Sequence, residues 1–185
     1  MNIILGVSGS ISAYKAADVT SKLTKDGHDV SVILTEGGSR IITALTLQTL
    51  SKHKVYTDTF DEEDPALVNH IWLAEQADVF AIVPASADVI GKAAAGIADD
   101  MLTSTLVAAL NQSVVVMAPA MNTHMYENPI VQDNMEKLAS YGVRFIDPKT
   151  SLLACGTTGK GALADVDVIV KYIENLEGEI NNDQI

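Results

Sequence analysis

Two side chains in this sequence, one histidine and the single cysteine, are of types that exchange protons near neutral pH, and both have distinctive surroundings. His70 follows an acidic stretch and stands two positions before the only tryptophan. Because an imidazole titrates near neutrality, His70 could accept a proton from a thiol or orient a carboxylate. Cys155 lies among three glycines in residues 153–161, and a thiol with an ordinary pKa of about 8.5 keeps its proton at pH 7. Cys155 could therefore act as an acid on a closing flap. The alternatives are a partly buried structural histidine and a small buried cysteine.

An unusual loop follows the apolar run at residues 114–117 and is bounded by Pro119 and Pro129. It contains two methionines and a tyrosine, whereas loops mostly carry small polar residues. A loop after a buried strand projects from the carboxyl edge of a parallel sheet, where ligands bind in open α/β folds. We expect it to pack either against its own domain or against a cofactor ring, a substrate or another subunit.

Two further segments have residues small enough to let backbone amides approach a ligand. Residues 6–12, Gly-Val-Ser-Gly-Ser-Ile-Ser, precede the first helix, but they have neither the dinucleotide-binding spacing nor that of a P-loop. The positive charge of Lys15, in the first helical turn, opposes the helix dipole at a cost of roughly 0.3–1 kcal/mol. Either an anionic neighbour or a side chain that bends away into solvent would explain a lysine at this position. Residues 84–89 either line the edge of a heterocycle or begin a helix, with Ser86 or Asp88 as the cap.

The composition excludes several classes of function. The 24 acidic and 12 basic residues give a net charge of −12, which disfavours nucleic-acid binding. One cysteine forms no internal disulfide, and the other three histidines, His28, His53 and His124, lack the spacing of metal ligands. No apolar run is long enough to span a membrane, and no secretory leader is visible. We therefore expect a cytoplasmic protein without a metal.

Apolar strand-like runs alternate with helical patterns along the chain. Strands are expected at residues 2–7, 30–34, 55–56, 79–83, 114–117 and 143–146. Helices are expected at residues 13–25 with Ser12 as the N-cap, about 41–50, 89–110 with a break near Gly96, 131–140 and 166–176. This alternation predicts a Rossmann-like, three-layer α/β/α fold around a parallel sheet. Residues 1–177 should form a single domain, residues 58–64 a solvated acidic loop, and residues 178–185 a polar, frayed tail.

In this order, five segments together resemble the flavin-dependent cysteine decarboxylases. They are the small-residue first turn, His70-Ile71, Pro-Ala-Ser-Ala at 84–87, Pro-Ala-Met-Asn at 119–122 with Met125, and Ala-Cys-Gly at 154–156. The resemblance extends from residue 2 to about residue 176 and implies FMN as the cofactor. It assigns FMN to a pocket made by Gly9, Ser10, Thr35, Ser86, Ala87, Asp88 and Val89.

The resemblance also implies roles toward the substrate. His70 is then the catalytic histidine and Cys155 the proton donor, while Asn122 holds the substrate carboxylate. Met125, Lys15 and Lys160 are the other expected substrate contacts. The implied reaction, within coenzyme A biosynthesis, removes CO₂ from a phosphorylated cysteine conjugate, phosphopantothenoylcysteine, through a thioaldehyde and an enethiolate. The implied assembly is a homotrimer or a dodecamer of trimers.

Two departures from the family pattern affect these assignments. Asp88-Val89 stand where the family often has Asn-Thr, and Gly161-Ala162-Leu163 stand where it often has Gly-Arg-Met. Contacts at that edge of the flavin are therefore open, and a contact of the missing arginine is either absent or supplied by Lys160. Alternative functions are peptidyl-cysteine decarboxylation, flavin prenyl transfer and a non-catalytic flavin-binding regulatory subunit.

Overall fold

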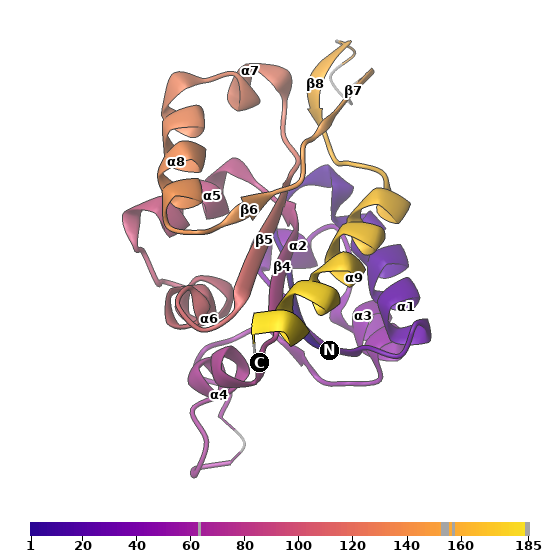
Figure 1. Cartoon of the computed structure of the whole chain (residues 1–185), viewed down its shortest axis with the longest axis vertical. Helices are drawn as coiled ribbons and strands as arrows, with labels where there is room; N and C mark the ends of the chain where they lie inside the picture. Colours follow the sequence, from indigo (N-terminus) through magenta and orange to yellow (C-terminus); the bar gives the residue numbers. More distant parts are fainter. Residues whose placement is uncertain (63, 153–155, 157, 184–185) are drawn as a thin grey trace.

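A parallel sheet of six strands forms the centre of the computed structural model, which describes residues 1–62, 64–152, 156 and 158–183 (Figure 1). Its strands are β1 (Asn2–Val7), β2 (Asp29–Leu34), β3 (Val55–Tyr56), β4 (Val79–Ala85), β5 (Val114–Pro119) and β6 (Arg144–Phe145). They lie in the order β3-β2-β1-β4-β5-β6, and every neighbouring pair is parallel. The predicted parallel α/β fold is confirmed.

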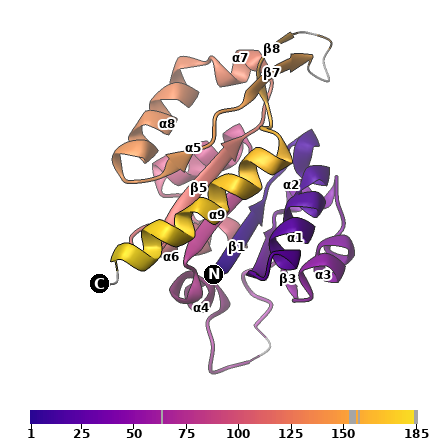
Figure 2. The ribbon, with the colours of Figure 1, turned by 45° about the vertical axis from the view of Figure 1, so that its right-hand side comes forward.

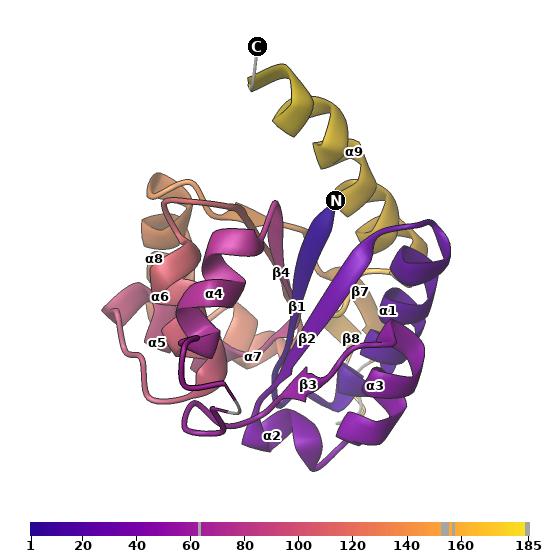
Figure 3. The same cartoon turned by 90° about the horizontal axis from the view of Figure 1, so that it is seen from below.

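Helices cover both faces of this sheet, as the view from below shows (Figure 3). On one face lie the short 3-10 helix η1 (Ile11–Lys15), α1 (Ala16–Lys25), α3 (Ala44–Ser51) and α9 (Val166–Asp183). On the other lie α4 (Asn69–Gln76), α5 (Ala87–Ala95), α6 (Met101–Ala109) and α8 (Pro129–Ser140). Two short helices, α2 (Glu36–Ser39) and α7 (Thr123–Tyr126), follow β2 and β5.

Alternating side chains of the strands divide the core into these two layers. In β1, Ile3 and Leu5 belong to the cluster that includes α1 and α9, whereas Ile4 belongs to the cluster that includes α4 and α6. Gly6 lies on the same side as Ile4, and a Cβ there would overlap the side chain of Leu102 on α6. The absence of a side chain at Gly6 therefore lets α6 pack directly on the sheet.

The strand order reverses between β1 and β4, the two neighbouring strands at the centre of the sheet. The chain runs outward from β1 to β3 and then returns to β4, from which it runs outward in the opposite direction. Such a reversal leaves a crevice beyond the carboxyl ends of the two central strands. The turns after β1 and β4 therefore flank the expected ligand site.

A separate antiparallel hairpin follows β6 and precedes α9. Its strands are β7 (Lys149–Leu152) and β8 (Thr158–Ala162). Figures 1 and 2 show the hairpin beside α7, beyond the carboxyl edge of the central sheet. The predicted flap, residues 153–161, covers the connection between these strands and most of β8, and Cys155 lies outside the described residues.

Helix boundaries differ from the sequence expectation at the start of α1 and at the end of α9, and agree with it between α5 and α6. Ser12 is not a helix cap, because Ser10 caps η1 and α1 begins only at Ala16. The break near Gly96 is confirmed, since this glycine ends α5 in the left-handed conformation with φ of 67°. The predicted frayed tail is wrong for the described residues, because α9 continues to Asp183.

The longer α9 has a physical cause. Ile180 packs against the same cluster as Ile169, Ile173 and Leu176, so the apolar stripe of the helix continues past residue 177. Glu179 also pairs with Arg144 of β6, with 2.7 Å between Oε2 and Nη1. Among the described helices, none combines the length and the apolar character that a membrane crossing requires.

Candidate active site

A buried serine joins the two turns that flank the crevice. The Ser8 hydroxyl, after β1, donates to the carbonyl of Pro84 at 2.7 Å, and its oxygen accepts from the backbone N–H of Ser86 at 2.9 Å. Ser8 is fully buried. This single side chain therefore fixes the turn after β1 against the turn after β4. Sequence reasoning missed it, because a serine between a strand and a glycine reads only as a small residue.

Three of the predicted cofactor residues begin helices at this edge. Ser10 caps η1 by accepting from Ser12 N–H, Thr35 caps α2 by accepting from Gly38 N–H, and Ser86 caps α5 by accepting from Val89 N–H. Of these, α5 is long enough to contribute a helix dipole, and its first turn carries Asp88. The hydroxyls of the three residues thus have structural roles in addition to any contact with a ligand.

Two adjoining cavities open at the carboxyl edge. The larger, about 660 Å³, is called here the carboxyl-edge cavity, and the smaller, about 510 Å³, the acidic cavity. They share three lining residues, Gly9, Ser86 and Asp88. Gly9 itself faces Gly37, and a Cβ on either would lie 3.1 Å from the other's Cα, so this shared wall is backbone in close contact.

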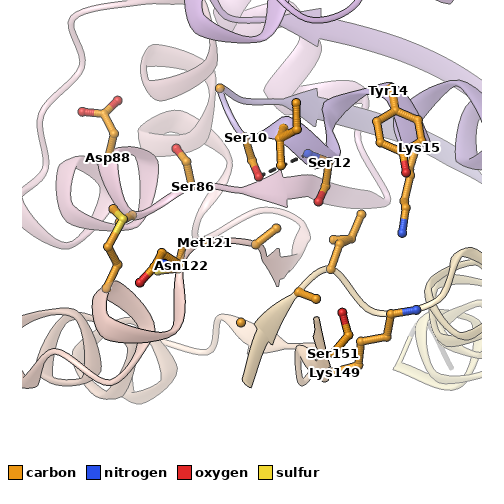
Figure 4. A pocket seen from close by; sticks show the side chains of 18 residues that line it. Ser10, Ser12, Tyr14, Lys15, Ser86, Asp88, Met121, Asn122, Lys149 and Ser151 are labelled. Carbon is orange, nitrogen blue, oxygen red and sulfur yellow. Dashed lines mark hydrogen bonds between the residues drawn. The ribbon is translucent and has the colours of Figure 1, made fainter. Parts of the chain in front are cut away.

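Most of the predicted site residues line these cavities. The carboxyl-edge cavity is lined by Gly9, Ser10, Lys15, Ser86, Ala87, Asp88, Asn122 and Met125, and the acidic cavity also by Thr35 and Val89. Figure 4 shows that Asn122 and Asp88 lie toward one side of the carboxyl-edge cavity and Lys15 toward the other. The structure therefore brings together segments from the turns after β1, β4 and β5.

Two predicted residues lie elsewhere. His70 lies near the start of α4 and lines neither cavity; Figures 1 and 2 place α4 at the opposite end of the molecule from α7. Its Nδ1 is buried and has no hydrogen-bond partner within the described part of the chain. Lys160 of β8 also lines neither cavity, because its ammonium lies 3.0 Å from Asp147 Oδ1 and 5.5 Å from the centre of the Tyr126 ring.

The loop at 119–129 packs partly against its own domain. Tyr126 is only 8% exposed, whereas Met125 is 48% exposed at the cavity. Asn122 caps α7, and its Oδ1 accepts from the N–H of His124 at 2.8 Å. This bond fixes the plane of the Asn122 amide at the cavity wall. Tyr126 therefore packs against its own domain, whereas Met125 is exposed to whatever occupies the cavity.

Two glycines of β8, Gly159 and Gly161, let the hairpin pack closely against this loop. The N–H of Met121 donates to the carbonyl of Gly161 at 2.9 Å. A Cβ at Gly159 would overlap the side chain of Thr123, and Gly161 adopts φ of 146° with the Met121 carbonyl directly beside it. Side chains at these two positions would thus displace β8 from α7.

The hairpin also supplies two cavity residues that sequence reasoning missed, Lys149 and Ser151 of β7. Residues 161–163, where the sequence departs from the family pattern, line the carboxyl-edge cavity as well. The carboxylate of Asp165 pairs with Lys149, and this hydrogen bond, followed by the lysine charge, holds the pKa of Asp165 below its usual value. Nothing in the local sequence distinguishes Lys149 from a solvated lysine.

Charges in the acidic cavity are partly compensated. Lys92 lies 3.4 Å from Asp88 and 3.2 Å from Asp99. Desolvation lowers the pKa of Lys92, but the two carboxylates outweigh it and the pKa is raised. Within the described ranges, no group of three or more histidine, aspartate or glutamate side chains is arranged to hold a metal ion.

Comparison with known proteins identifies relatives of this chain over almost its whole length. A "Probable phosphopantothenoylcysteine decarboxylase" of Streptococcus mutans is 51% identical over 172 residues, which cover 93% of this chain and 96% of the relative. The "Coenzyme A biosynthesis bifunctional protein CoaBC" of Bacillus subtilis is 51% identical over 94% of this chain, which spans only 42% of that longer protein.

Solved structures agree in fold. A PPC decarboxylase mutant complexed with pantothenoylaminoethenethiol matches with a TM-score of 0.86 and 30% identity, over 96% of this chain and 98% of that one. The FMN-dependent cysteine decarboxylase SpaF matches with a TM-score of 0.80 and 31% identity, over 93% and 94%. The family model described as Flavoprotein matches residues 1–177. The chain, whose turns after β1, β4 and β5 meet around one cavity, therefore belongs to the Flavoprotein family.

Proposed function

We propose that this chain catalyses the FMN-dependent decarboxylation of phosphopantothenoylcysteine to phosphopantetheine, a step of coenzyme A biosynthesis. The observation that carries the proposal is the carboxyl-edge cavity, where Asn122 and the turns after β1 and β4 meet. The relative from Streptococcus mutans, matched over almost its whole length, supports the same activity.

The residues at the carboxyl edge fit FMN. Both cavities have volumes within the range of about 300–1,000 Å³ that small-molecule sites occupy. The Gly9–Gly37 contact keeps side chains out of the shared wall, and the first turn of α5 offers backbone donors to an anionic or polar ligand. Gly9, Ser10, Thr35 and residues 86–89 are the proposed cofactor contacts.

Bound FMN would supply the two-electron oxidation of the substrate thiol that makes loss of CO₂ possible, and the matching reduction afterwards. The chain itself must hold the carboxylate and move protons. The Asn122 amide, fixed by its bond to His124 N–H, donates to the substrate carboxylate. Cys155 delivers the final proton, and His70 accepts the thiol proton in the first step.

The position of His70 bears on the assembly. The helices α4 and α7 lie at opposite ends of the folded molecule, so His70 and Asn122 of the same copy do not meet. A homo-oligomer in which His70 of one copy reaches the cavity of the next would do so. Large apolar side chains on the surface, including Phe60 at 91% exposure and Ile130 at 69%, are available to bury in such contacts. We propose a cytoplasmic homotrimer or a dodecamer of trimers.

Turnover by the purified, FMN-loaded protein tests the proposal. We expect CO₂ release and phosphopantetheine formation from phosphopantothenoylcysteine, with little reaction of a peptide that ends in cysteine. Faster reaction of the peptide would instead identify a peptidyl-cysteine decarboxylase. Binding of FMN without decarboxylation of either compound would identify a non-catalytic flavin-binding subunit.

A further inference from the structure

One side of the carboxyl-edge cavity carries two lysines from distant parts of the chain. Lys15 ends η1, and Lys149 begins β7. Both line the cavity, and Figure 4 shows their side chains on the side away from Asn122 and Asp88. The cavity therefore has an amide-bearing side and a cationic side.

The positive charge on this side is only partly neutralised. Asp165 pairs with Lys149, and the charge of Lys15 acts on the same carboxylate as a weaker cause of its lowered pKa. Lys15 itself forms no ion pair with another described residue; its ammonium lies 5.9 Å from the centre of the Tyr14 ring. Asp165 thus pairs with Lys149 alone, and within the described part of the chain no carboxylate forms an ion pair with Lys15.

Lys160, on the same hairpin as Lys149, differs from it in the partner of its ammonium group and in its position relative to the cavity. Its ammonium pairs with Asp147 and lies over the Tyr126 ring, outside the cavity. The Lys149 side chain, by contrast, is 38% exposed at the cavity and faces an anion that a ligand could replace. Of these two hairpin lysines, only Lys149 is placed to meet a molecule in the cavity.

We propose that Lys149, with Lys15 beside it, binds the phosphate monoester of the substrate and thereby selects the phosphorylated conjugate. This inference rests on the proposed function. A substrate with a carboxylate at one end and a phosphate at the other matches a cavity with Asn122 on one side and the lysines on the other. The phosphate, with a charge of about −1.5 to −2, replaces Asp165 as the partner of Lys149.

Equilibrium binding to the FMN-loaded protein provides a test that does not require turnover. The probes are phosphopantetheine and pantetheine, which differ only in the phosphate, titrated by calorimetry. We expect the wild-type protein to bind phosphopantetheine more tightly. Lys149→Ala should weaken phosphopantetheine binding on the order of tenfold to hundredfold and leave pantetheine binding unchanged, as expected for a lost charge-assisted hydrogen bond.

Two further variants separate the phosphate contact from a structural effect. Asp165→Asn removes the competing carboxylate and should tighten phosphopantetheine binding several-fold. Lys22→Ala is the matched control, because Lys22 pairs with Asp167 at 2.9 Å, outside the cavity, and its loss changes the net charge equally. This control should leave the preference for phosphopantetheine unchanged.

The same phosphate chemistry is present in FMN, so the dissociation constant of FMN must be measured for each variant. An unchanged FMN affinity in Lys149→Ala, together with a lost preference for phosphopantetheine, supports the proposal. A weakened FMN affinity with the preference retained would assign Lys149 to the cofactor and overturn it. Equal binding of both probes by the wild-type protein would also overturn it, whereas selective binding without turnover would contradict only the proposed function.

Discussion

The carboxyl-edge cavity has one wall supplied by the central sheet and another supplied by the β7–β8 hairpin, and different contacts hold the two. The sheet wall is fixed by a buried side chain, Ser8, whose hydroxyl joins the turns after β1 and β4. The hairpin wall is fixed by backbone contact, in which Gly159 and Gly161 lie directly against α7 and the preceding loop. We infer that the sheet wall supports the fold and the cofactor, while the hairpin wall governs the substrate.

Asn122→Asp should have the largest effect on turnover, because Asn122 lies where the two walls meet. Aspartate can cap α7 as well as asparagine does, so the local fold is retained. A carboxylate facing the substrate carboxylate costs several kcal/mol, and we expect turnover to fall at least about a hundredfold with FMN still bound. Assays of CO₂ release and flavin absorbance measure both.

The matched control for this variant is Asn128→Asp. Asn128 caps α8 by accepting from the N–H of Ile130 at 2.9 Å, and it does not line the cavity. The control adds the same charge nearby and should leave turnover within about twofold of the wild type. Equal losses in the two variants would show that Asn122 does not contact the substrate.

Ser8→Ala should damage the sheet wall. It removes the hydroxyl that joins Pro84 and Ser86 to the turn after β1, leaving two backbone groups without these bonds. We expect a loss of about 1–3 kcal/mol in the free energy of unfolding, together with weaker FMN binding. Denaturant unfolding and flavin titration measure the two effects. The exposed Ser140 also donates to a backbone carbonyl, and Ser140→Ala should cost less than about 0.5 kcal/mol.

Gly159→Ala should displace the hairpin wall without unfolding the sheet. The new methyl group overlaps Thr123, so β8 must move away from α7. We expect kcat/KM to fall about tenfold, within the 1–3 kcal/mol typical of overpacking, while the FMN affinity stays unchanged. Gly178→Ala on α9 meets no atom within 4 Å and should leave kcat/KM unaltered. A variant that lost FMN and retained its KM would contradict the division between the two walls.

The smallest expected effect is a change in the pKa of one carboxyl group, that of Asp165. The pKa of Asp165 is lowered from 3.8, mainly by its hydrogen bond to Lys149. Since the folded value lies below the unfolded one, the contribution of this group to stability is present above pH 3.8 and is lost as the pH falls through the folded value. Lys149→Ala should return the Asp165 pKa toward 3.8, whereas Lys22→Ala should not. Carboxyl carbon chemical shifts followed against pH test this.

The central sheet was predictable from the sequence because its strands are continuous apolar runs, each separated by a helical pattern. Short elements could not be predicted, because a few residues do not show a periodic pattern. The strand β7 has the sequence Lys-Thr-Ser-Leu and α7 has only four residues, so neither shows a periodicity. The start of α1 was misplaced because Ser10 and Ser12 are equally good capping residues in sequence, and only the turn distinguishes them.

Site residues that belong to a recognisable sequence motif could be predicted. Residues such as Ser86 and Asn122 were found by their motifs, and the structure brings them to one cavity. Ser8 lies within the first-turn segment and Lys149 in no motif, and the role of each depends on a partner that is 76 or 16 positions away. No local pattern could reveal those roles. The catalytic roles of His70 and Cys155 stay predictions.

The two ends of the β7–β8 hairpin are paired neighbours, since Lys149 lies opposite Ala162 in the ladder. An insert whose ends meet can be exchanged for another of different sequence or length without moving the strand before it or the helix after it. The hairpin is therefore a natural module for evolutionary change. A lineage could acquire a new substrate by replacing the parts of this segment around the proposed proton donor, Cys155, while the sheet wall of the cavity stays in place.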